Sequence, residues 1–484
     1  MIEKIISILP QPERWRFWIL LSILVKSLFF IYKINEKAVP NETYTSIWAK
    51  EQRDSKTYIG PMEDFIQTGI YSYDYRLPGY GILYGFFRLF LTVSHSLNAL
   101  IVLQLLLAAW SVYILAWIAK TIFRKKEFFY YSFFLYLLST YTSIYDYQLL
   151  TESFCISALV FSFYFALQQN WKNAILSGLF LSWSIFLRPA NAPLLILWGL
   201  FHLLANRKWF RPLTWNWKLA IAFSIPFIIL DGLWLYRNYQ KYNGFYPLSR
   251  TIYYTGLEDK YTLSMFHFMN AYGASVCWWQ PAGETAYFIR KNKTLESISS
   301  RAHTKICNAD SFSLLRTLVR DIDDHPENTE QNKIKNQMAI ALFDRCTEAI
   351  KKEKPFLYHI ESRLRYFVQF IFHWGTDNLF DRLDKDLNTF SFSIKMLYTL
   401  LYVFVICFGL VGCIFLFIRA NQNPALLFLT LTSLYFVMVF PLVLKMDEYR
   451  YLAPAYPFLL LISIYRLDQV ICFPIIRLWK NQNS

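Results

Sequence analysis

Long apolar segments separated by short polar loops dominate the pattern of this 484-residue chain. Several segments approach the length that an α-helix needs to cross a bilayer, about 20 residues. By length and hydropathy we predict about ten spanning helices. They cover residues 17–32, 97–119, 128–144, 153–167, 173–187, 192–205, 218–236, 396–418, 424–444 and 452–465. The pattern therefore predicts an all-α polytopic membrane protein.

The apolar segment 79–93 decides the topology, because counting it as a span reverses every later loop. If it crossed the bilayer, the basic loop at 124–126 would face outward, against the positive-inside rule. If it lies flat as an interfacial amphipathic helix, this loop and the other basic clusters face inward. Those clusters are Arg14 with Arg16, Lys172, Arg207 with Lys208 and Arg211, Arg419, and Arg477 with Lys480. We therefore expect interfacial helices in the first loop and both termini in the cytoplasm.

Two polar segments then face outward. The first is the loop 33–96, and the second, 238–395, is long enough for a small, mainly helical domain with helices near 311–322, 331–352 and 356–374. The predicted organisation is a membrane catalytic module at 1–237, an external domain at 238–395 and C-terminal spans at 396–484. If the external domain faces an oxidising compartment, Cys307 and Cys346 are its favoured disulfide pair.

Composition supports the membrane assignment and narrows the class of partner. The chain is 55% hydrophobic and 19% aromatic, with a net charge of +15. The basic residues sit in short loops between apolar segments, which favours contact with anionic lipid over nucleic acid. The 7 cysteines show no CxxC pair or Cys/His metal spacing, so we predict no metal site and no cofactor.

Charged and aromatic residues from separate loops gather on the outer side of this topology. The first loop supplies Asp54, Lys56, Tyr58, Tyr75, Arg76 and Tyr80, and later loops and span ends supply Asp146, Glu152, Arg188, Arg237, Asn238, Arg450 and Tyr451. Such a cluster suits an anionic lipid head group and a hydroxyl-bearing second substrate. Lys26 lies inside the first span and needs a partner within the bundle, for which Asp231 is the candidate.

These residues resemble the motifs of bacterial members of the GT-C glycosyltransferase superfamily, which includes aminoarabinose transferases and protein O-mannosyltransferases. The matching segments are Asp54 with Tyr58, Arg-Leu-Pro-Gly-Tyr at 76–80, Thr-Glu-Ser-Phe at 151–154, Leu-Arg-Pro at 187–189, the stretch from Trp234 to Ser249, and Tyr-Arg-Tyr-Leu-Ala-Pro at 449–454. Many relatives carry two adjacent acids in the first loop, whereas Asp54 stands between Arg53 and Ser55. Aminoarabinose-type members have a Lys-Pro-Pro box where this chain has Arg-Leu-Pro, which argues against the substrate of that subgroup.

The resemblance implies a sugar donor linked to polyprenyl phosphate. Transfer of the sugar from this donor needs one carboxylate that accepts the proton of the acceptor hydroxyl. It also needs cations that stabilise the departing phosphate. Asp54 is the favoured base, and Glu152 is a second acid for which Asp146 competes. The candidate phosphate ligands are Arg76, Arg237, Lys56 and Arg450, and the candidate substrate-lining residues are Tyr58, Tyr75, Tyr80, Asn238 and Tyr451.

Each of these assignments has a simpler alternative. Asp54 could be a solvated loop acid, and Arg76 could rest on lipid head groups. Arg237 could snorkel from the end of a span, and Glu152 could be an acid favoured by a helix N-terminus. Arg450 and Tyr451 could serve as ordinary interfacial anchors.

The prediction is therefore an inverting glycosyltransferase that moves a sugar to a lipid, glycan or protein hydroxyl. Its expected location is the bacterial inner membrane, with the active site on the periplasmic face. A transporter or flippase, or a ligase of lipid-linked glycans, is the alternative. A flippase should carry polar residues at several depths of the membrane, whereas Lys26 is nearly alone there.

Overall fold

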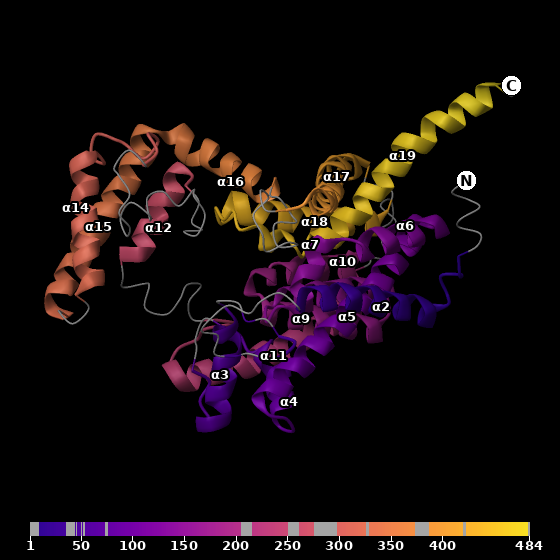
Figure 1. Cartoon of the computed structure of the whole chain (residues 1–484), viewed down its shortest axis with the longest axis horizontal. Coiled ribbons are helices and arrows are strands. Elements are labelled where there is room, and N and C mark those ends of the chain that lie inside the picture. Colours follow the sequence, from indigo (N-terminus) through magenta and orange to yellow (C-terminus); the bar gives the residue numbers. More distant parts are fainter. Residues whose placement is uncertain are drawn as a thin grey trace. The chain divides into compact units, whose positions relative to one another are not determined.

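The computed structural model describes residues 9–34, 44, 46–49, 51, 54–72, 76–204, 215–249, 261–274, 298–325, 329–372, 387–419 and 423–482. Helices make up every regular element within these ranges (Figure 1), which confirms the all-α prediction for the described part. The chain divides into two compact units. Unit 1 comprises Met1–Arg250, Trp374–Leu434 and Ala453–Ser484, and unit 2 comprises Thr251–His373 and Tyr435–Leu452.

Unit 1 is built around long apolar helices. Its elements are α2 (Trp15–Ile34), α3 (Ser55–Thr68), α4 (Gly81–Arg88), α5 (Val93–Phe123), α6 (Lys126–Leu137), α7 (Thr140–Ser143), η1 (Ile144–Tyr147), α8 (Glu152–Leu167), α9 (Trp171–Leu187), η2 (Pro189–Asn191), α10 (Leu194–Leu204), α11 (Trp217–Tyr242), α17 (Thr389–Arg419), most of α18 (Pro424–Met438) and α19 (Tyr456–Gln482). Helix α5 packs against α2, α6 and α8. Helix α9 packs against α8 and α11, and α17 packs along α19.

Five helices in the described part are long and apolar enough to cross a membrane. They are Trp15–Tyr32, Val93–Phe123, Trp217–Tyr242, Thr389–Ile418 and Pro424–Val443. Two of the other predicted spans correspond to α8 and α9, which have 16 and 17 residues. The chain is therefore a multi-pass membrane protein by helix length and composition, and the number of about ten spans stays a prediction.

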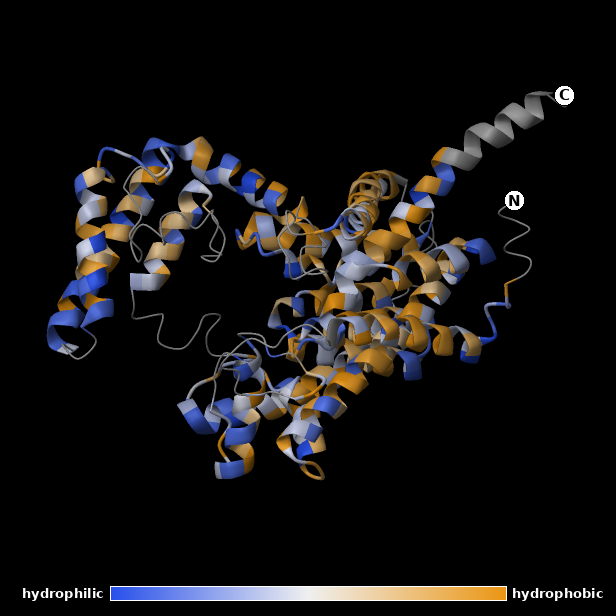
Figure 2. Ribbon diagram, in the orientation of Figure 1, coloured by the Kyte–Doolittle hydropathy of each residue, from blue (hydrophilic) through white to orange (hydrophobic). Residues whose placement is uncertain are grey.

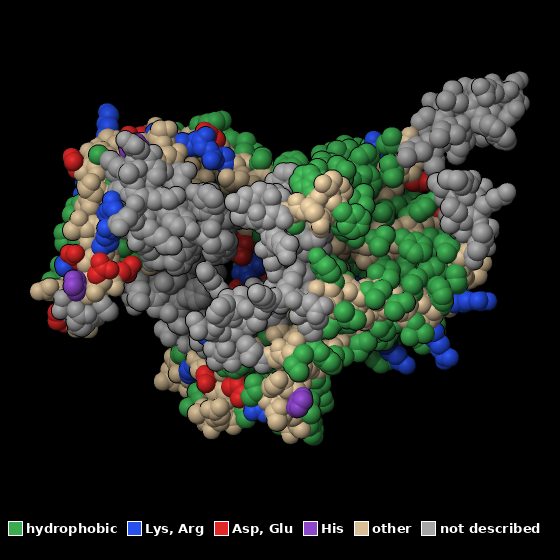
Figure 3. Space-filling view, in the orientation of Figure 1, with side chains coloured by type: hydrophobic (Ala, Val, Ile, Leu, Met, Phe, Trp, Pro, Cys, Tyr) green, Lys and Arg blue, Asp and Glu red, His purple; other side chains and the backbone are tan. Residues whose placement is uncertain are grey.

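The surface of these helices is apolar where a lipid chain would touch it. On α2, Leu20, Leu24 and Leu28 are each more than half exposed, whereas Trp18 and Lys26 on the opposite face are buried. Helices in water show the reverse order, with apolar residues facing the core. The ribbon of the unit 1 helices is coloured largely as hydrophobic (Figure 2), and hydrophobic side chains cover much of the same helices in the space-filling view (Figure 3). This exposed apolar surface suits a hydrocarbon environment.

The segment 79–93 contains the short helix α4. Its eight residues give a length of about 12 Å, far less than the roughly 30 Å of a bilayer core. Helix α4 packs against α3, where Glu63 accepts hydrogen bonds from Tyr84 and Arg88. Burial alone would raise the pKa of Glu63, but the bonds from Arg88 and Tyr84 lower it. The segment is too short to span, as predicted, and its interfacial position stays a prediction.

Unit 2 has a core of its own, formed by α12 (Tyr261–Tyr272), α14 (Ala309–Asp324) and α15 (Thr329–Glu353). Helices α14 and α15 confirm the predicted helices at 311–322 and 331–352. Phe268, Phe312 and Phe343 meet at its centre, with ring centroids 6.0 Å apart in each contact with Phe268. Cys307 and Cys346 lie in this core as free thiols.

The predicted helix at 356–374 is interrupted. A π-helical turn, η4 (Leu357–Glu361), precedes α16 (Ser362–Ile371). Because the wider turn changes the register, Phe356 and Ile360 are exposed, whereas Tyr366 and Phe370 are buried. Regular helical spacing predicts one apolar face through Phe356, Ile360, Phe367, Phe370 and Ile371. That prediction is wrong for its first half, because Phe356 and Ile360 are exposed. The remaining elements of unit 2 are η7 (Val439–Val443) and η8 (Tyr449–Leu452).

A glycine sets the close approach of α9 and α11. A Cβ added at Gly178 would lie 1.9 Å from the carbonyl oxygen of Phe223. We expect Gly178→Ala to destabilise the protein by about 1–3 kcal/mol, because the two backbones must separate. Gly232→Ala on α11 is the control: its Cβ would meet nothing within 4 Å, and alanine favours a helix. Thermal unfolding in detergent should show a lower midpoint for the first variant and an equal or higher midpoint for the second.

Candidate active site

Asp54 and Arg76 lie together where the first loop enters α3. Nη2 of Arg76 lies 3.6 Å from Asp54 Oδ1, and its Nε donates a hydrogen bond of 3.0 Å to Thr57 Oγ1. The guanidinium lies over the Tyr58 ring, 4.3 Å from its centroid. Both charged side chains are partly open to solvent, 16% for Asp54 and 21% for Arg76. The structure thus brings Asp54, Tyr58 and Arg76 into one group, here called the first-loop cluster.

The start of α3 explains how this cluster is held. Asp54 directly precedes the helix, where the positive end of the helix dipole favours a carboxylate. Thr57 donates from both its backbone nitrogen and its hydroxyl to the carbonyl oxygen of Asp54. The same hydroxyl accepts the bond from Arg76, so Thr57 joins the two segments. Lys56 is exposed on this turn.

The Gly79–Tyr80 end of the Arg-Leu-Pro-Gly-Tyr box packs against the end of α9. Trp183 donates from its indole nitrogen to the Gly79 carbonyl at 3.2 Å. A Cβ at Gly79 would lie 2.5 Å from the carbonyl carbon of Phe186. Tyr80 is fully buried, with its ring centroid 5.7 Å from that of Tyr58. Only glycine fits at position 79, where the backbone of the box lies against that of α9. This close contact positions Tyr80 beside the first-loop cluster.

Glu152 begins α8 and forms a buried ion pair with Arg188, the residue that follows α9. Arg188 Nη1 lies 3.0 Å from Glu152 Oε1, and the two side chains are 9% and 1% exposed. The turn after Arg188 is fixed by Asn191, whose amide donates to the carbonyl oxygen of Ser184 at 3.2 Å. In the sequence, Arg188 belongs to the Leu-Arg-Pro motif, and no role was predicted for it. The ion pair could have been predicted from an arginine at the end of one predicted span and an acid at the start of another.

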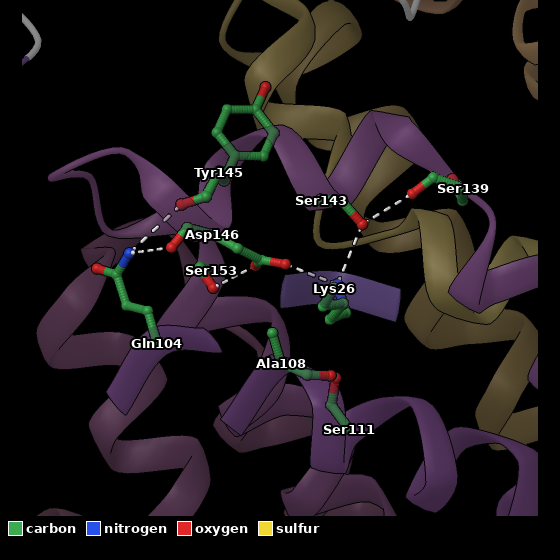
Figure 4. A network of polar contacts seen from close by, with 9 residues as sticks. All are labelled: Lys26, Gln104, Ala108, Ser111, Ser139, Ser143, Tyr145, Asp146 and Ser153. Carbon is green, nitrogen blue, oxygen red and sulfur yellow. Dashed lines mark hydrogen bonds and ion pairs between the residues drawn. The ribbon is translucent and has the colours of Figure 1, made fainter. Parts of the chain in front are cut away.

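Asp146 lies in η1 and pairs with Lys26 of α2 (Figure 4). Asp146 Oδ2 is 2.6 Å from Lys26 Nζ, and the side chains are 7% and 5% exposed. Asp231 instead accepts a hydrogen bond of 2.9 Å from the backbone nitrogen of Leu248. The predicted Lys26–Asp231 pair is therefore wrong, because α2 packs against η1 and α5, whereas α11 packs against α9 and α10.

The three candidate carboxylates differ in access. Glu152 and Asp146 are each almost completely buried against a cation, whereas Asp54 keeps 16% of its side chain exposed. A proton acceptor must reach the hydroxyl of an incoming substrate. Of these three residues, Asp54 has the geometry that best suits this role.

Arg237 and Asn238 end the buried part of α11. Arg237 donates from Nη1 to Asn238 Oδ1 at 2.8 Å and from Nη2 to the carbonyl oxygen of Tyr71 at 2.7 Å. Its guanidinium also lies 4.6 Å from the Trp234 ring centroid. These contacts fix the guanidinium within the protein, and phosphate binding by Arg237 stays a prediction.

The same end of α11 holds the backbone at Leu248 in a left-handed conformation, with φ of 58°. Trp234 and Asn238 donate to the Leu248 carbonyl at 2.6 and 3.1 Å, and Asp231 accepts from its nitrogen. Asn238 also donates to the carbonyl of Tyr246 at 2.8 Å. Such a backbone persists when several contacts determine it. The predicted role of Asn238 in lining a substrate therefore competes with a role in holding this segment.

Tyr71 lies within electrostatic range of both arginine sites. Burial raises the pKa of its phenol, and the positive charges of Arg237 and Arg76 lower it in part. The Arg237 guanidinium is 5.9 Å from the Tyr71 ring centroid. The charges of Arg76 and Arg237 therefore both act on the Tyr71 phenol, a relation that the sequence gave no means of finding.

The remaining predicted residues belong to unit 2 or lie outside the description. Arg450 pairs with Glu448 at 2.5 Å, and the Tyr451 ring stacks on Phe440 with centroids 4.7 Å apart, all within unit 2. Tyr75 lies outside the described residues. Among the residues that the structure describes, no group of three or more His, Cys, Asp or Glu side chains could hold a metal ion.

Comparison with protein families decides the affiliation of the chain. The model of the Alg9-like mannosyltransferase family matches residues 16–269, a range that carries the first-loop cluster and both buried ion pairs. The chain belongs to the Alg9-like mannosyltransferase family. It is therefore a membrane glycosyltransferase of the GT-C superfamily, as the resemblance predicted.

The Alg9-like assignment rests on the family model alone. The solved structure of the archaeal oligosaccharyltransferase AglB from Archaeoglobus fulgidus, in complex with an inhibitory peptide and a dolichol-phosphate, is similar at 10% identity with a TM-score of 0.43. The match covers 96% of this chain and 52% of that one, so the chain spans about half the length of that protein. No curated protein matches the chain.

Proposed function

We propose that the protein transfers a single sugar from a polyprenyl-phosphate donor to an acceptor hydroxyl, with inversion at the anomeric carbon. The observation that carries this proposal is the first-loop cluster, in which a carboxylate and a guanidinium lie 3.6 Å apart and partly open to solvent. Membership of a mannosyltransferase family supports sugar transfer and makes mannose the first sugar to test.

In the proposed step, the acceptor oxygen forms a bond to the anomeric carbon while the bond from that carbon to the phosphate oxygen breaks. Asp54 takes the proton of the acceptor hydroxyl. Arg76 stabilises the negative charge on the departing polyprenyl phosphate, for which a guanidinium is well suited. One displacement inverts the anomer without a covalent intermediate, so no second nucleophilic carboxylate is required.

Other residues take supporting roles in this proposal. Lys56 and Arg237, both in unit 1, supply further positive charge for the donor phosphate. Tyr58, Tyr80 and Asn238 line the substrates. Glu152 and Asp146 are each matched by a buried cation, which favours a structural role near the site over proton transfer.

The proposed site lies on the external face, which is the periplasmic face of a bacterial inner membrane, and both chain ends lie in the cytoplasm. The basic loops support this orientation through the positive-inside rule. The acceptor is a lipid, glycan or protein that presents a hydroxyl at that face.

The test is a donor panel supplied to purified protein in liposomes. The panel contains radiolabelled mannose, other hexoses and a pentose on polyprenyl phosphate, the same sugars on nucleotides, and an oligosaccharide on polyprenyl diphosphate. We expect label transfer and release of polyprenyl phosphate with at least one donor of the first class. Transfer from nucleotide donors alone, or of the whole oligosaccharide alone, would overturn the proposal.

The box glycine gives a further prediction. Gly79→Ala should lower the transfer rate about 10- to 100-fold, because the added Cβ would push the box from α9 and displace Arg76 and Tyr80. Gly199→Ala on α10 is the matched control, since its Cβ would come no nearer than 3.9 Å to Phe223. The initial rate with the best donor of the panel measures both, and equal rates would show that the close contact does not set the site geometry.

A further inference from the structure

The loop at residues 144–151, between α7 and α8, is tied to the segments that carry the proposed site. Ser55, the residue after Asp54, donates from its hydroxyl to the carbonyl oxygen of Leu149 at 2.9 Å. Glu152 is the residue that follows the loop. A shift of this loop would therefore move both the start of α3 and the start of α8.

Gln104 of α5 holds the same loop through one fully buried amide. Its nitrogen donates to the carbonyl oxygens of Tyr145, Asp146 and Gln148 at 3.4, 3.2 and 3.0 Å, the first two of which are drawn in Figure 4. Its oxygen accepts a hydrogen bond of 2.9 Å from the Tyr80 hydroxyl. Gln104 thus connects the Arg-Leu-Pro-Gly-Tyr box with the loop.

The Lys26–Asp146 pair holds the loop from the side of α2. Lys26 Nζ contacts Asp146 Oδ2 at 2.6 Å and donates to Ser143 Oγ at 3.0 Å. The other carboxylate oxygen, Asp146 Oδ1, accepts a bond of 2.7 Å from Ser153 Oγ (Figure 4). Ser153 is the neighbour of Glu152, so one carboxylate connects the ammonium of α2 with the first turn of α8.

We propose that Lys26, Asp146 and Gln104 are positioning residues, which hold the loop 144–151 so that Glu152, Tyr80 and the first-loop cluster keep the geometry required for transfer. This inference rests on the proposed function and deepens it. It also assigns Asp146 a role that differs from that of a catalytic acid, since both of its carboxylate oxygens already bond to Lys26 and Ser153.

The energy of a buried ion pair suggests that this network serves to position the loop more than to stabilise the whole protein. Removing two charges from water costs several kcal/mol per ion, and apolar side chains of similar volume often stabilise a protein as well as a buried ion pair does. Directional bonds from three elements instead determine one arrangement of the loop. Misplacement by about 1 Å is enough to cost about 100-fold in rate.

Kinetics of four variants test the proposal. Lys26→Met, Asp146→Asn and Gln104→Met should each lower kcat about 10- to 100-fold, with the KM for the donor within about 2-fold of wild type. Lys26→Arg, which keeps the charge, should restore part of the rate. Ser22→Ala is the matched control, because Ser22 is buried on α2 one turn from Lys26 and bonds to the Trp18 carbonyl of its own helix.

Two additional readouts separate positioning from other roles. The effect of Asp146→Asn on kcat should largely disappear when Glu152→Gln is already present, because both changes disturb the same element. Amide hydrogen exchange across 144–155 should increase in Lys26→Met and Gln104→Met without any substrate, and should not change in Ser22→Ala. The exchange result does not depend on which donor the protein uses.

The outcomes are distinct. Variants that match Ser22→Ala in both kcat and exchange would overturn the proposal. Loss of the acid limb of the pH–rate profile in Asp146→Asn alone, with Lys26→Met near wild type, would make Asp146 the proton acceptor and also overturn it. If a charge-altering variant fails to fold, Gln104→Met decides, since it changes no charge. A wild type inactive with every donor would overturn the proposed function, while exchange would still test the positioning network.

Discussion

Replacing Arg188 by Met is expected to lower the free energy of unfolding by about 3–5 kcal/mol. The change leaves the Glu152 carboxylate, which is 1% exposed, without the guanidinium 3.0 Å away. Burying a charge without its partner is among the largest penalties that a single substitution produces. Thermal or denaturant unfolding in detergent measures the loss, and we also expect the variant to be inactive because Glu152 lies next to the loop 144–151.

Two matched changes show whether the loss comes from the unpaired charge. The double variant Glu152→Gln/Arg188→Met removes both charges and should recover much of the stability. Lys333→Met breaks an exposed pair with Glu330, of similar length at 3.1 Å, and should change stability by no more than about 1 kcal/mol. A double variant as unstable as Arg188→Met would attribute the loss to the packing of the arginine stem instead.

Replacing Asp54 by Asn is expected to reduce the turnover rate by at least about 100-fold, because proton transfer to a positioned base contributes about 10²- to 10⁴-fold. Asparagine has nearly the same shape, and the Asp54 carbonyl would still accept from Thr57. The fold and the position of Arg76 should therefore persist. Initial rates at saturating donor, together with the unfolding midpoint, measure the two effects separately.

Asp64→Asn is the control for this substitution. Asp64 lies on the same helix, is also partly exposed, and is separated from Asp54 by nearly three turns. It should retain the wild-type rate. A rate unchanged in Asp54→Asn would remove this residue from the role of base, and equal losses in both variants would point to a general effect of charge on α3.

Local patterns allowed much of the fold to be predicted. The helices of unit 2 near 311–322 and 331–352 were predicted from the sequence, and α14 and α15 confirm them. The distribution of basic residues among the loops predicted that the segment 79–93 does not cross the membrane. Its helix α4 has eight residues and is too short to cross. Asp54, Tyr58 and Arg76 were predicted to belong to one cluster on the outer side, and the structure brings their side chains together.

Contacts between distant segments could not be read from such patterns. A lysine inside a span predicts a buried anion, but Lys26 and Asp146 are separated by 120 positions, and both Asp146 and Asp231 satisfied the requirement. Choosing between them needs the packing of α2 against η1, which hydropathy does not encode. The π turn at Leu357–Glu361 is missed for a related reason, since regular helical spacing assumes an unbroken register.

In the proposed reaction, the first-loop cluster transfers a sugar from a polyprenyl phosphate. Its most direct test is a single-turnover experiment with radiolabelled polyprenyl-phosphate mannose, or with the best donor of the panel, in which transferred sugar and released polyprenyl phosphate are counted together. For the wild type we predict one phosphate released per sugar transferred, with an inverted anomer. For Asp54→Asn we predict a retained donor and almost no transfer. Sugar transfer without phosphate release, a retained anomer, or equal turnover by the two proteins would contradict the claim.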